Sequence, residues 1–289
     1  MTGFAALYVK AREMEQVIIP VRTIFTTHAT ALGRSLVSKG KDVAATARQK
    51  DFDALEEAKA IGIEEKHSTE YACVHHCDAS TTVSLITQKE SKALFGVRLK
   101  LTYNGLHLPD FPDGKPMIVK QHAARERVVA ALARLFPDED FSDAFLMYTS
   151  GRPEFHNKGF DSLLSALAKV KQQKSKRNAS QKFVCFFLVP WGHYQIKPAF
   201  GDTIATHFLE NEQAHPLVQQ AKSLSFDNLD WLKVVLYPVY LGTEDDDLFN
   251  AAYYDLVSGF DLGVFASSYE PWGYTQIGRA SCRERVYTK

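Results

Sequence analysis

Strand-like and helix-like segments alternate along most of this chain, and the alternation constrains the fold more than any other feature. Runs rich in β-branched and aromatic residues predict strands at 21–27, 79–86, 97–106, 144–150, 183–189, 233–240 and 262–267. Helical spacing predicts helices at 28–36, 54–77, 87–96, 119–135, 160–172 and 248–258. This order is typical of α/β proteins with a parallel sheet.

The length and the turn residues indicate two α/β units. A chain of 289 residues is long enough for two domains of ordinary size. Residues 107–118 hold three prolines and a glycine, which marks a domain edge. We therefore expect one domain at 1–110 and a second at 111–275. The stretch 190–232, polar and irregular with some helix, would be an excursion from the second domain.

The charge balance argues against two classes of partner. Lys+Arg and Asp+Glu number 34 each, so the chain lacks the net positive charge with which proteins attract nucleic acid or anionic membranes. The N-terminus does not have the layout of a signal peptide, and no apolar run approaches the ~20 residues that span a bilayer. These features predict a cytoplasmic protein that binds neither nucleic acid nor membrane.

The cysteines leave a choice between a metal site and buried thiols. Four cysteines are too few for a disulfide framework in a chain of this length. The stretch CVHHC places Cys73 and Cys77 one helical turn apart, with His75 and His76 between them. On a helix the two histidines would point away from the face that carries the cysteines. We favour buried thiols and expect no metal site.

The junction TSGRPEFHNKGFDSLL, residues 149–164, carries more charge than a connection between a strand and a helix needs. A helix N-terminus offers unpaired N–H groups to a phosphate, Arg152 can fork onto two phosphate oxygens, and Lys158 supplies a compact charge. Gly151 and Gly159 let the backbone approach closely. The loop predicts a diphosphate site, with a solvated surface loop as an equal alternative on this pattern alone.

Two further stretches follow predicted strands and carry polar residues. FTTHATALGRSL places His28 and Arg34 after one strand, and SSYEPWGYT places Glu270 after another. Ligands of α/β sheets bind outside the carboxyl ends of the strands, so we expect these stretches and the 149–164 loop to converge on one cleft. Taken singly, His28 fits a core histidine, Glu270 a helix cap and Tyr253 a core aromatic residue.

The last 14 residues differ from the rest of the chain. They are rich in charge, lack apolar periodicity, and resemble the translation of a DNA-sequencing adapter. We interpret 276–289, including Cys282, as a non-native tail.

Six stretches together resemble the glycogen synthases of glycosyltransferase family 3. The resemblance runs from about residue 17 to 275 and rests on FTTHATALGR, TVSLIT, YNGL, TSGRPEFHNKGFDSLLSAL, YYDLVSGFDLGVF and SSYEPWGYT. It implies a GT-B fold, in which two Rossmann-like domains face each other across a cleft. It also implies transfer of glucose from a UDP-glucose donor to the 4-hydroxyl of an α-1,4-glucan such as glycogen, with retention of configuration and without metal or cofactor.

The resemblance also implies roles for particular residues. Arg152 and Lys158 would hold the donor phosphates, with Arg34 close to them. Glu270 would be the first glutamate of the family's E-x7-E motif, near the transferring glucose, which His28 would contact from the N-terminal domain.

The remaining donor contacts would come from the C-terminal domain. Backbone N–H groups around Gly273 and Tyr274 would face the donor, and Tyr253 would stack on uracil, although Tyr254 is equally placed in the sequence. The second glutamate of the motif would fall at Gly278.

The front of the N-terminal domain and the end of the C-terminal domain have no counterpart in the sequence. We therefore expect both domains to be incomplete and this chain, as a fragment, to be inactive. A homo-oligomer of the full-length parent stays open. Two other hypotheses are a different retaining GT-B transferase and a non-catalytic glucan-binding or scaffold protein of the same fold. A dinucleotide-dependent dehydrogenase is disfavoured, because no G-x-G-x-x-G follows a predicted strand.

Overall fold

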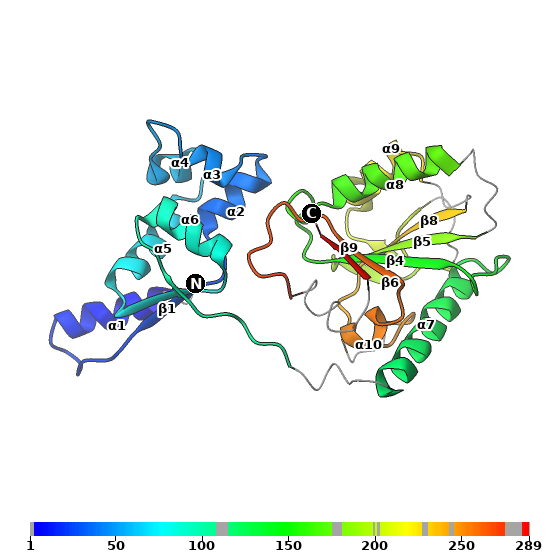
Figure 1. Cartoon of the computed structure of the whole chain (residues 1–289), viewed down its shortest axis with the longest axis horizontal. Helices are drawn as coiled ribbons and strands as arrows, with labels where there is room; N and C mark the ends of the chain where they lie inside the picture. The colour runs from blue at the N-terminus through cyan, green and yellow to red at the C-terminus, as the bar shows by residue number, and fades with distance from the viewer. Residues whose placement is uncertain are drawn as a thin grey trace. The chain divides into compact units, whose positions relative to one another are not determined.

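The computed structural model describes residues 3–107, 115–174, 181–198, 200, 203–226, 231–242, 246–274 and 285–288. The chain forms two compact units (Figure 1). Unit 1 comprises Met1–Gly105 together with Tyr269–Trp272, and unit 2 comprises Leu106–Ser268 together with Gly273–Lys289.

Unit 1 is a small parallel sheet covered by helices. Its strands lie in the order β1-β2-β3 and are β1 (Ile24–Thr27), β2 (Ala79–Thr82) and β3 (Lys100–Leu101). Its helices are α1 (Gly3–Met14), α2 (Ala31–Ser38), α3 (Val43–Thr46), α4 (Ala54–Ala60), α5 (Glu64–His76) and α6 (Leu85–Phe95). The core lies mainly between the helices, where Leu32, Leu36, Leu94 and Phe95 are buried. The predicted α/β class is confirmed in this unit.

Unit 1 differs from the prediction at three places, and a local signal explains two of them. The strand predicted at 79–86 ends early, because Ser84 and Thr87 form a capping box that starts α6. The single helix predicted at 54–77 is two helices, α4 and α5, separated by Gly62 at φ 74°. The strand predicted at 97–106 is reduced to the two residues of β3.

Unit 2 is a parallel sheet with helices on both faces. The strand order is β10-β9-β4-β5-β8, and every pairing is parallel. The strands are β4 (Phe145–Ser150), β5 (Phe183–Leu188), β8 (Leu232–Tyr237), β9 (Leu262–Phe265) and β10 (Arg285–Thr288). Helices α7 (Lys115–Leu135) and α10 (Tyr253–Val257) cover one face, and α8 (Phe160–Lys174) and α9 (Pro216–Ser223) cover the other (Figure 1).

Alternate residues of the central strands supply the two cores of unit 2. Val184 and Phe186 of β5 pack toward α7 and α10, and Cys185 and Phe187 pack toward α8 and α9. Strands buried on both faces read as continuous apolar runs, which is why the sequence predicts them clearly.

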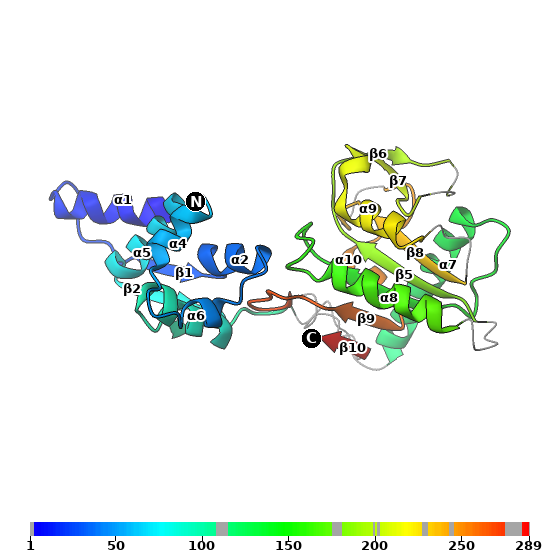
Figure 2. The same ribbon diagram turned by 90° about the horizontal axis from the view of Figure 1, so that it is seen from above.

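The excursion at 190–232 has more structure than the sequence predicts. It contains an antiparallel hairpin of β6 (His193–Ile196) and β7 (His207–Leu209), a 3-10 turn and α9 (Figure 2). Leu209 of the hairpin and Leu217 of α9 are buried in the same core cluster. The excursion therefore packs on the sheet rather than looping away from it.

The helix predicted at 248–258 is shorter than expected. Its first residues form a turn, because the Asp246 carboxylate accepts the N–H groups of Leu248, Phe249 and Asn250. Asn250 adopts a left-handed conformation with φ 49°, which is incompatible with a right-handed α-helix. Helix α10 therefore starts only at Tyr253.

The predicted non-native tail lies largely outside the described residues. Of 276–289, only 285–288 are described, and they form β10 beside β9. Among the helices of the described chain, none has the length and apolar character needed to cross a membrane.

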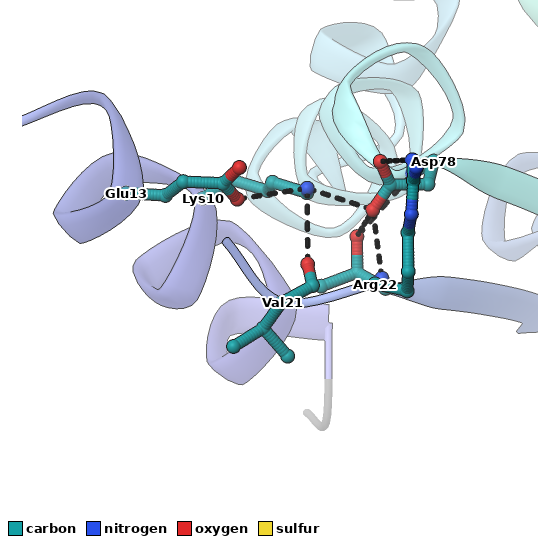
Figure 3. Close-up of polar contacts among 6 residues, drawn as sticks. Lys10, Glu13, Val21, Arg22 and Asp78 are labelled. Atoms are coloured by element: carbon teal, nitrogen blue, oxygen red, sulfur yellow. Dashed lines mark hydrogen bonds and ion pairs between the residues drawn. The ribbon is translucent and has the colours of Figure 1, made fainter. Parts of the chain in front are cut away.

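A polar network ties α1 to the start of the unit 1 sheet (Figure 3). Lys10 Nζ lies 2.7 Å from Asp78 Oδ2 and 2.9 Å from Glu13 Oε2, and it donates to the Val21 carbonyl. Asp78 Oδ2 also accepts the backbone N–H and the hydroxyl of Thr23. The hydrogen bond from Lys10, together with that from the Thr23 N–H, holds the pKa of Asp78 below its ordinary value of 3.8.

Replacing Asp78 by asparagine should lower the thermal midpoint of unit 1 at pH 7. A carboxyl pKa that is lower in the folded state contributes stability above the unfolded value, and this contribution is lost as the pH falls through the folded pKa. The midpoints of wild type and variant, followed by circular dichroism, should therefore converge as the pH falls well below 3.8. Asp51→Asn, at an exposed position of the same unit, is the control. A gap between the midpoints that persists in acid would contradict the assignment.

Candidate functional site

The loop between β4 and α8 forms a bend above the centre of the unit 2 sheet. Strand β4 pairs with both β9 and β5, so the loop leaves the sheet at its middle. The loop is held by its own turns, with the Lys158 N–H donating to the Glu154 carbonyl at 2.8 Å and the Gly159 N–H to the His156 carbonyl at 3.0 Å. Helix α8 begins at the next residue, Phe160. The N-terminus of this 15-residue helix therefore lies directly behind the bend.

Arg152 lies at the open side of this bend. Its side chain is 61% exposed, and Nη2 lies 3.0 Å from Glu154 Oε1. The other Glu154 oxygen accepts a hydrogen bond from the Asn157 amide at 3.3 Å. An exposed ion pair of this kind contributes only about 0–1 kcal/mol, so a doubly charged phosphate group can take the guanidinium from Glu154.

Lys158 is held against the same bend by its hydrocarbon stem. A Cβ on Gly151 would lie 3.1–3.3 Å from three carbons of the Lys158 side chain, so the stem packs directly on this glycine. Lys158 is partly buried, whereas Arg152 is exposed. The two cations therefore extend from neighbouring points of one bend.

A cavity of about 470 Å³ opens beside this bend in unit 2. Its wall is strongly aromatic and is formed by Ser150, Gly151, Arg152, Pro153, Leu188, Pro190, Val239, Tyr240, Leu241, Tyr253, Tyr254 and Tyr274. The Tyr253 hydroxyl lies 2.7 Å from the Ser150 hydroxyl, which fixes this ring at the end of β4. Flat aromatic walls next to a guanidinium suit a ligand with a planar base and an anionic group.

Both candidate uracil-stacking residues, Tyr253 and Tyr254, line this cavity. Their rings contact each other edge-to-face with centroids 5.2 Å apart. Tyr274 is 45% exposed and lines the same cavity, next to the buried Gly273 at φ 84°.

The loop is also joined to the chain that leaves β9. Gly159 adopts φ 67°, and a Cβ there would clash with the Ala266 carbonyl. The Ser268 N–H donates to the Asn157 carbonyl at 2.8 Å. The ends of the adjacent strands β4 and β9 are therefore packed together.

Unit 1 carries a second cavity, of about 330 Å³, at the carboxyl end of β1. His28 and Arg34 both line it, His28 from the turn after β1 and Arg34 from the first turns of α2. His28 is exposed and Arg34 is partly buried. Thr30 caps the helix between them by accepting the Gly33 N–H at 3.1 Å.

Glu70 lines this cavity as well and is a residue that the sequence does not single out. Its Oε2 accepts the N–H of Ala31, at the start of α2, at 2.8 Å. Burial raises the pKa of Glu70 from 4.5 to about 7 and outweighs the effects of the Ala31 N–H and of Arg34, which lower it.

Glu70 should make the stability of unit 1 fall as the pH rises from 4.5 to 7. In this window the folded protein keeps a proton that the unfolded chain has released, so the unfolding free energy decreases, by up to about 3 kcal/mol at 1.36 kcal/mol per pH unit. Glu70→Gln keeps an acceptor for the Ala31 N–H and should remove this dependence.

Urea unfolding at pH 5 and pH 8, followed by circular dichroism, measures the effect. Glu65→Gln, at an exposed position of the same helix, controls for a general change in charge. Equal pH dependence in wild type and Glu70→Gln would show that the raised pKa does not contribute.

Glu270 lies in the short segment Tyr269–Trp272, which packs as part of unit 1. Tyr269 is buried in unit 1, and the Trp272 ring contacts the Tyr103 ring at a centroid distance of 5.6 Å. Glu270 itself is partly buried. The predicted site residues thus form two groups: His28, Arg34 and Glu270 in unit 1, and Arg152, Lys158, Tyr253, Gly273 and Tyr274 in unit 2.

The CVHHC stretch forms the last turn of α5 and the residue after it. Cys73 is buried, and burial raises the pKa of its thiol to about 11. In the ranges that the structure describes, no three His, Cys, Asp or Glu side chains are grouped so that they could hold a metal ion.

Comparison with solved structures defines the class of the fold. The catalytic domain of starch synthase IV from Arabidopsis thaliana, solved with ADP and acarbose, superposes with a TM-score of 0.53 at 16% identity, covering 99% of this chain and 54% of that one. The chain, with one parallel α/β sheet in each unit, has the GT-B fold.

Sequence comparison then defines the family. A family model described as glycogen synthase matches residues 3–199 and 195–283, and the chain belongs to this family. The glycogen [starch] synthase of Neurospora crassa is 28% identical over 95% of this chain and 48% of its own length. Glycogen [starch] synthase isoform 1 of Saccharomyces cerevisiae is 25% identical over 89% and 47%. The chain spans about half the length of these curated relatives.

Proposed function

We propose that the protein encoded by the complete gene is a retaining glucosyltransferase, which moves glucose from UDP-glucose to the 4-hydroxyl end of an α-1,4-glucan such as glycogen. The observation that carries the proposal is the bend after β4. There Arg152 and Lys158 flank one glycine beside an aromatic cavity, in a chain of the glycogen synthase family.

In this proposal the donor binds along the bend and the cavity. Arg152 forks onto the diphosphate, Lys158 adds a second charge, and the start of α8 contributes its N–H groups. The uracil ring occupies the aromatic part of the cavity, against Tyr253 or Tyr254.

The chemistry that these groups support is departure of the nucleotide. As the bond between glucose and phosphate breaks, negative charge grows on the leaving UDP, and cations already in place stabilise it without reorganising. Glu270 and His28 act at the glucose, and Arg34 adds positive charge near the phosphates.

Elongation of glycogen by the complete protein, with radiolabelled UDP-glucose, ADP-glucose and GDP-glucose in parallel, tests the proposal. Transfer from UDP-glucose, with α-linked product detected by NMR, is the expected result. Preference for another nucleotide would place the protein among other retaining GT-B transferases. Absence of transfer from every donor would overturn the proposal and favour a glucan-binding or scaffold role.

A further inference from the structure

We propose that Glu90 is a positioning residue whose buried carboxylate holds the helix that carries Arg34 and the segment that carries Glu270 in one arrangement. The inference rests on the proposed function for its link to catalysis. It uses contacts inside unit 1, to which Tyr269–Trp272 also belong.

Glu90 is a carboxylate in a place where carboxylates are costly. It lies on α6 with 7% of its surface exposed, and burial raises its pKa despite the two hydroxyl groups that donate to it. An apolar residue would fill this position at lower cost, unless the hydrogen bonds of the carboxylate are needed. The Glu90 carboxylate therefore orients the groups that donate hydrogen bonds to it and does not only fill space.

The first of these hydrogen bonds fixes the start of α2. The Thr30 hydroxyl donates to Glu90 Oε2 at 2.8 Å and accepts the Gly33 N–H at 3.1 Å. Because both roles of the hydroxyl are used, Glu90 sets the orientation of the cap. A Cβ on Gly33 would clash with Thr30 Oγ1 and come within 2.8 Å of Glu90 Oε2, so α2 approaches Glu90 closely at this glycine.

The second hydrogen bond fixes the segment after β9. The Tyr269 hydroxyl donates to the same oxygen of Glu90 at 2.9 Å and lies 3.5 Å from the Thr30 carbonyl. Tyr269 is 5% exposed, and burial raises the pKa of its phenol, which keeps the donor proton in place. Glu270 is the next residue, so the anchored tyrosine limits where its backbone can lie.

One oxygen atom thus joins two stretches that each carry predicted site residues. Gln88, another buried polar residue of α6, is bonded differently. It is 8% exposed, donates to the Leu99 carbonyl and accepts from Arg98, so its contacts stay next to its own helix. This pair of residues allows a matched test of positioning against general stability.

The activity test uses the complete protein with Glu90→Ala, Glu90→Gln, Tyr269→Phe and, as control, Gln88→Ala. Because a displacement of about 1 Å can cost about 100-fold in rate, we expect Glu90→Ala and Tyr269→Phe to lower kcat about 10- to 100-fold, while KM for UDP-glucose changes less than about twofold. Glu90→Gln keeps an acceptor for both hydroxyls and should retain most of the activity.

Two kinetic outcomes would overturn the inference. One is a loss in Gln88→Ala as large as that in Glu90→Ala at equal thermal stability. The other is an equal loss of kcat in Glu90→Gln and Glu90→Ala. It would show that the hydrogen-bond acceptor at position 90 does not determine the activity.

Hydrogen exchange of the chain itself gives a readout that needs no transferase activity. Amide exchange in 269–272 should be faster in Glu90→Ala and Tyr269→Phe than in wild type, and unchanged in Gln88→Ala. If no donor supports transfer, the proposed function fails, and exchange still decides whether Glu90 holds this segment. Unchanged exchange in both variants would overturn the inference.

Discussion

Replacing Arg152 by alanine should weaken the binding of UDP to this chain about 10- to 100-fold, since one charge-assisted contact contributes about 1.5–3 kcal/mol. The guanidinium is exposed at the open side of the bend, and its partner in the free protein is the Glu154 carboxylate. If Arg152 binds as proposed, removing it takes away the forked contact to the diphosphate but leaves the aromatic cavity intact. Titration calorimetry with UDP and with uridine separates the two parts, because only UDP affinity should fall.

The charge itself needs a matched control. Arg134→Ala removes the same charge from an exposed position in the last turn of α7 and should leave UDP affinity unchanged. Arg152→Lys should recover only part of the affinity, because an ammonium cannot bind two oxygens in the forked geometry. Equal losses for UDP and uridine, or an effect of Arg134→Ala, would contradict the assignment of Arg152 to the phosphates.

Much of the fold is predictable because the central strands of unit 2 are buried on both faces. β4 falls within the predicted segment 144–150 and β5 within 183–189. β8 falls within 233–240 except for its first residue, Leu232. Two of the errors arise where a polar side chain starts an element or forms a turn in its place. Ser84 caps a helix that begins within a predicted strand. Asp246 accepts backbone N–H groups and so forms a turn where the first turn of a helix is predicted. Such caps depend on local hydrogen bonds that hydrophobic periodicity does not contain.

The site is predictable where its residues stand together in the sequence. Arg152 and Lys158 share one loop with two glycines, and this density of charge and turn residues is what makes the loop unusual. Glu154 lies between the two cations in the sequence and is the ion-pair partner of Arg152. Its charge alone could have identified it as that partner.

Glu70 and Glu90 carry no comparable signal. Both lie in ordinary polar helices, and their roles come from tertiary contacts. Tyr269 is 179 positions away from Glu90, and Ala31 is 39 positions away from Glu70. Sequence patterns within a single element do not register contacts at such separations.

Replacing Gly159 by alanine should destabilise unit 2 by about 3 kcal/mol and displace the loop that carries the two cations. The left-handed conformation costs a residue with a Cβ about 1–2 kcal/mol, and overpacking adds about 1–3 kcal/mol. Gly159 adopts φ 67°, and the added carbon would meet the backbone carbonyl of Ala266, which cannot swing aside as a flexible side chain can.

The two costs can be measured separately. Gly62→Ala introduces the same methyl group at φ 74°, with nothing within 4 Å of it, so it reports the conformational cost alone. Thermal unfolding should show a smaller loss for Gly62→Ala than for Gly159→Ala. UDP affinity should fall only in Gly159→Ala, because the packing of this glycine on the end of β9 sets the position of Lys158 and the start of α8. Equal losses in the two variants would mean that the contact with Ala266 does not hold the loop.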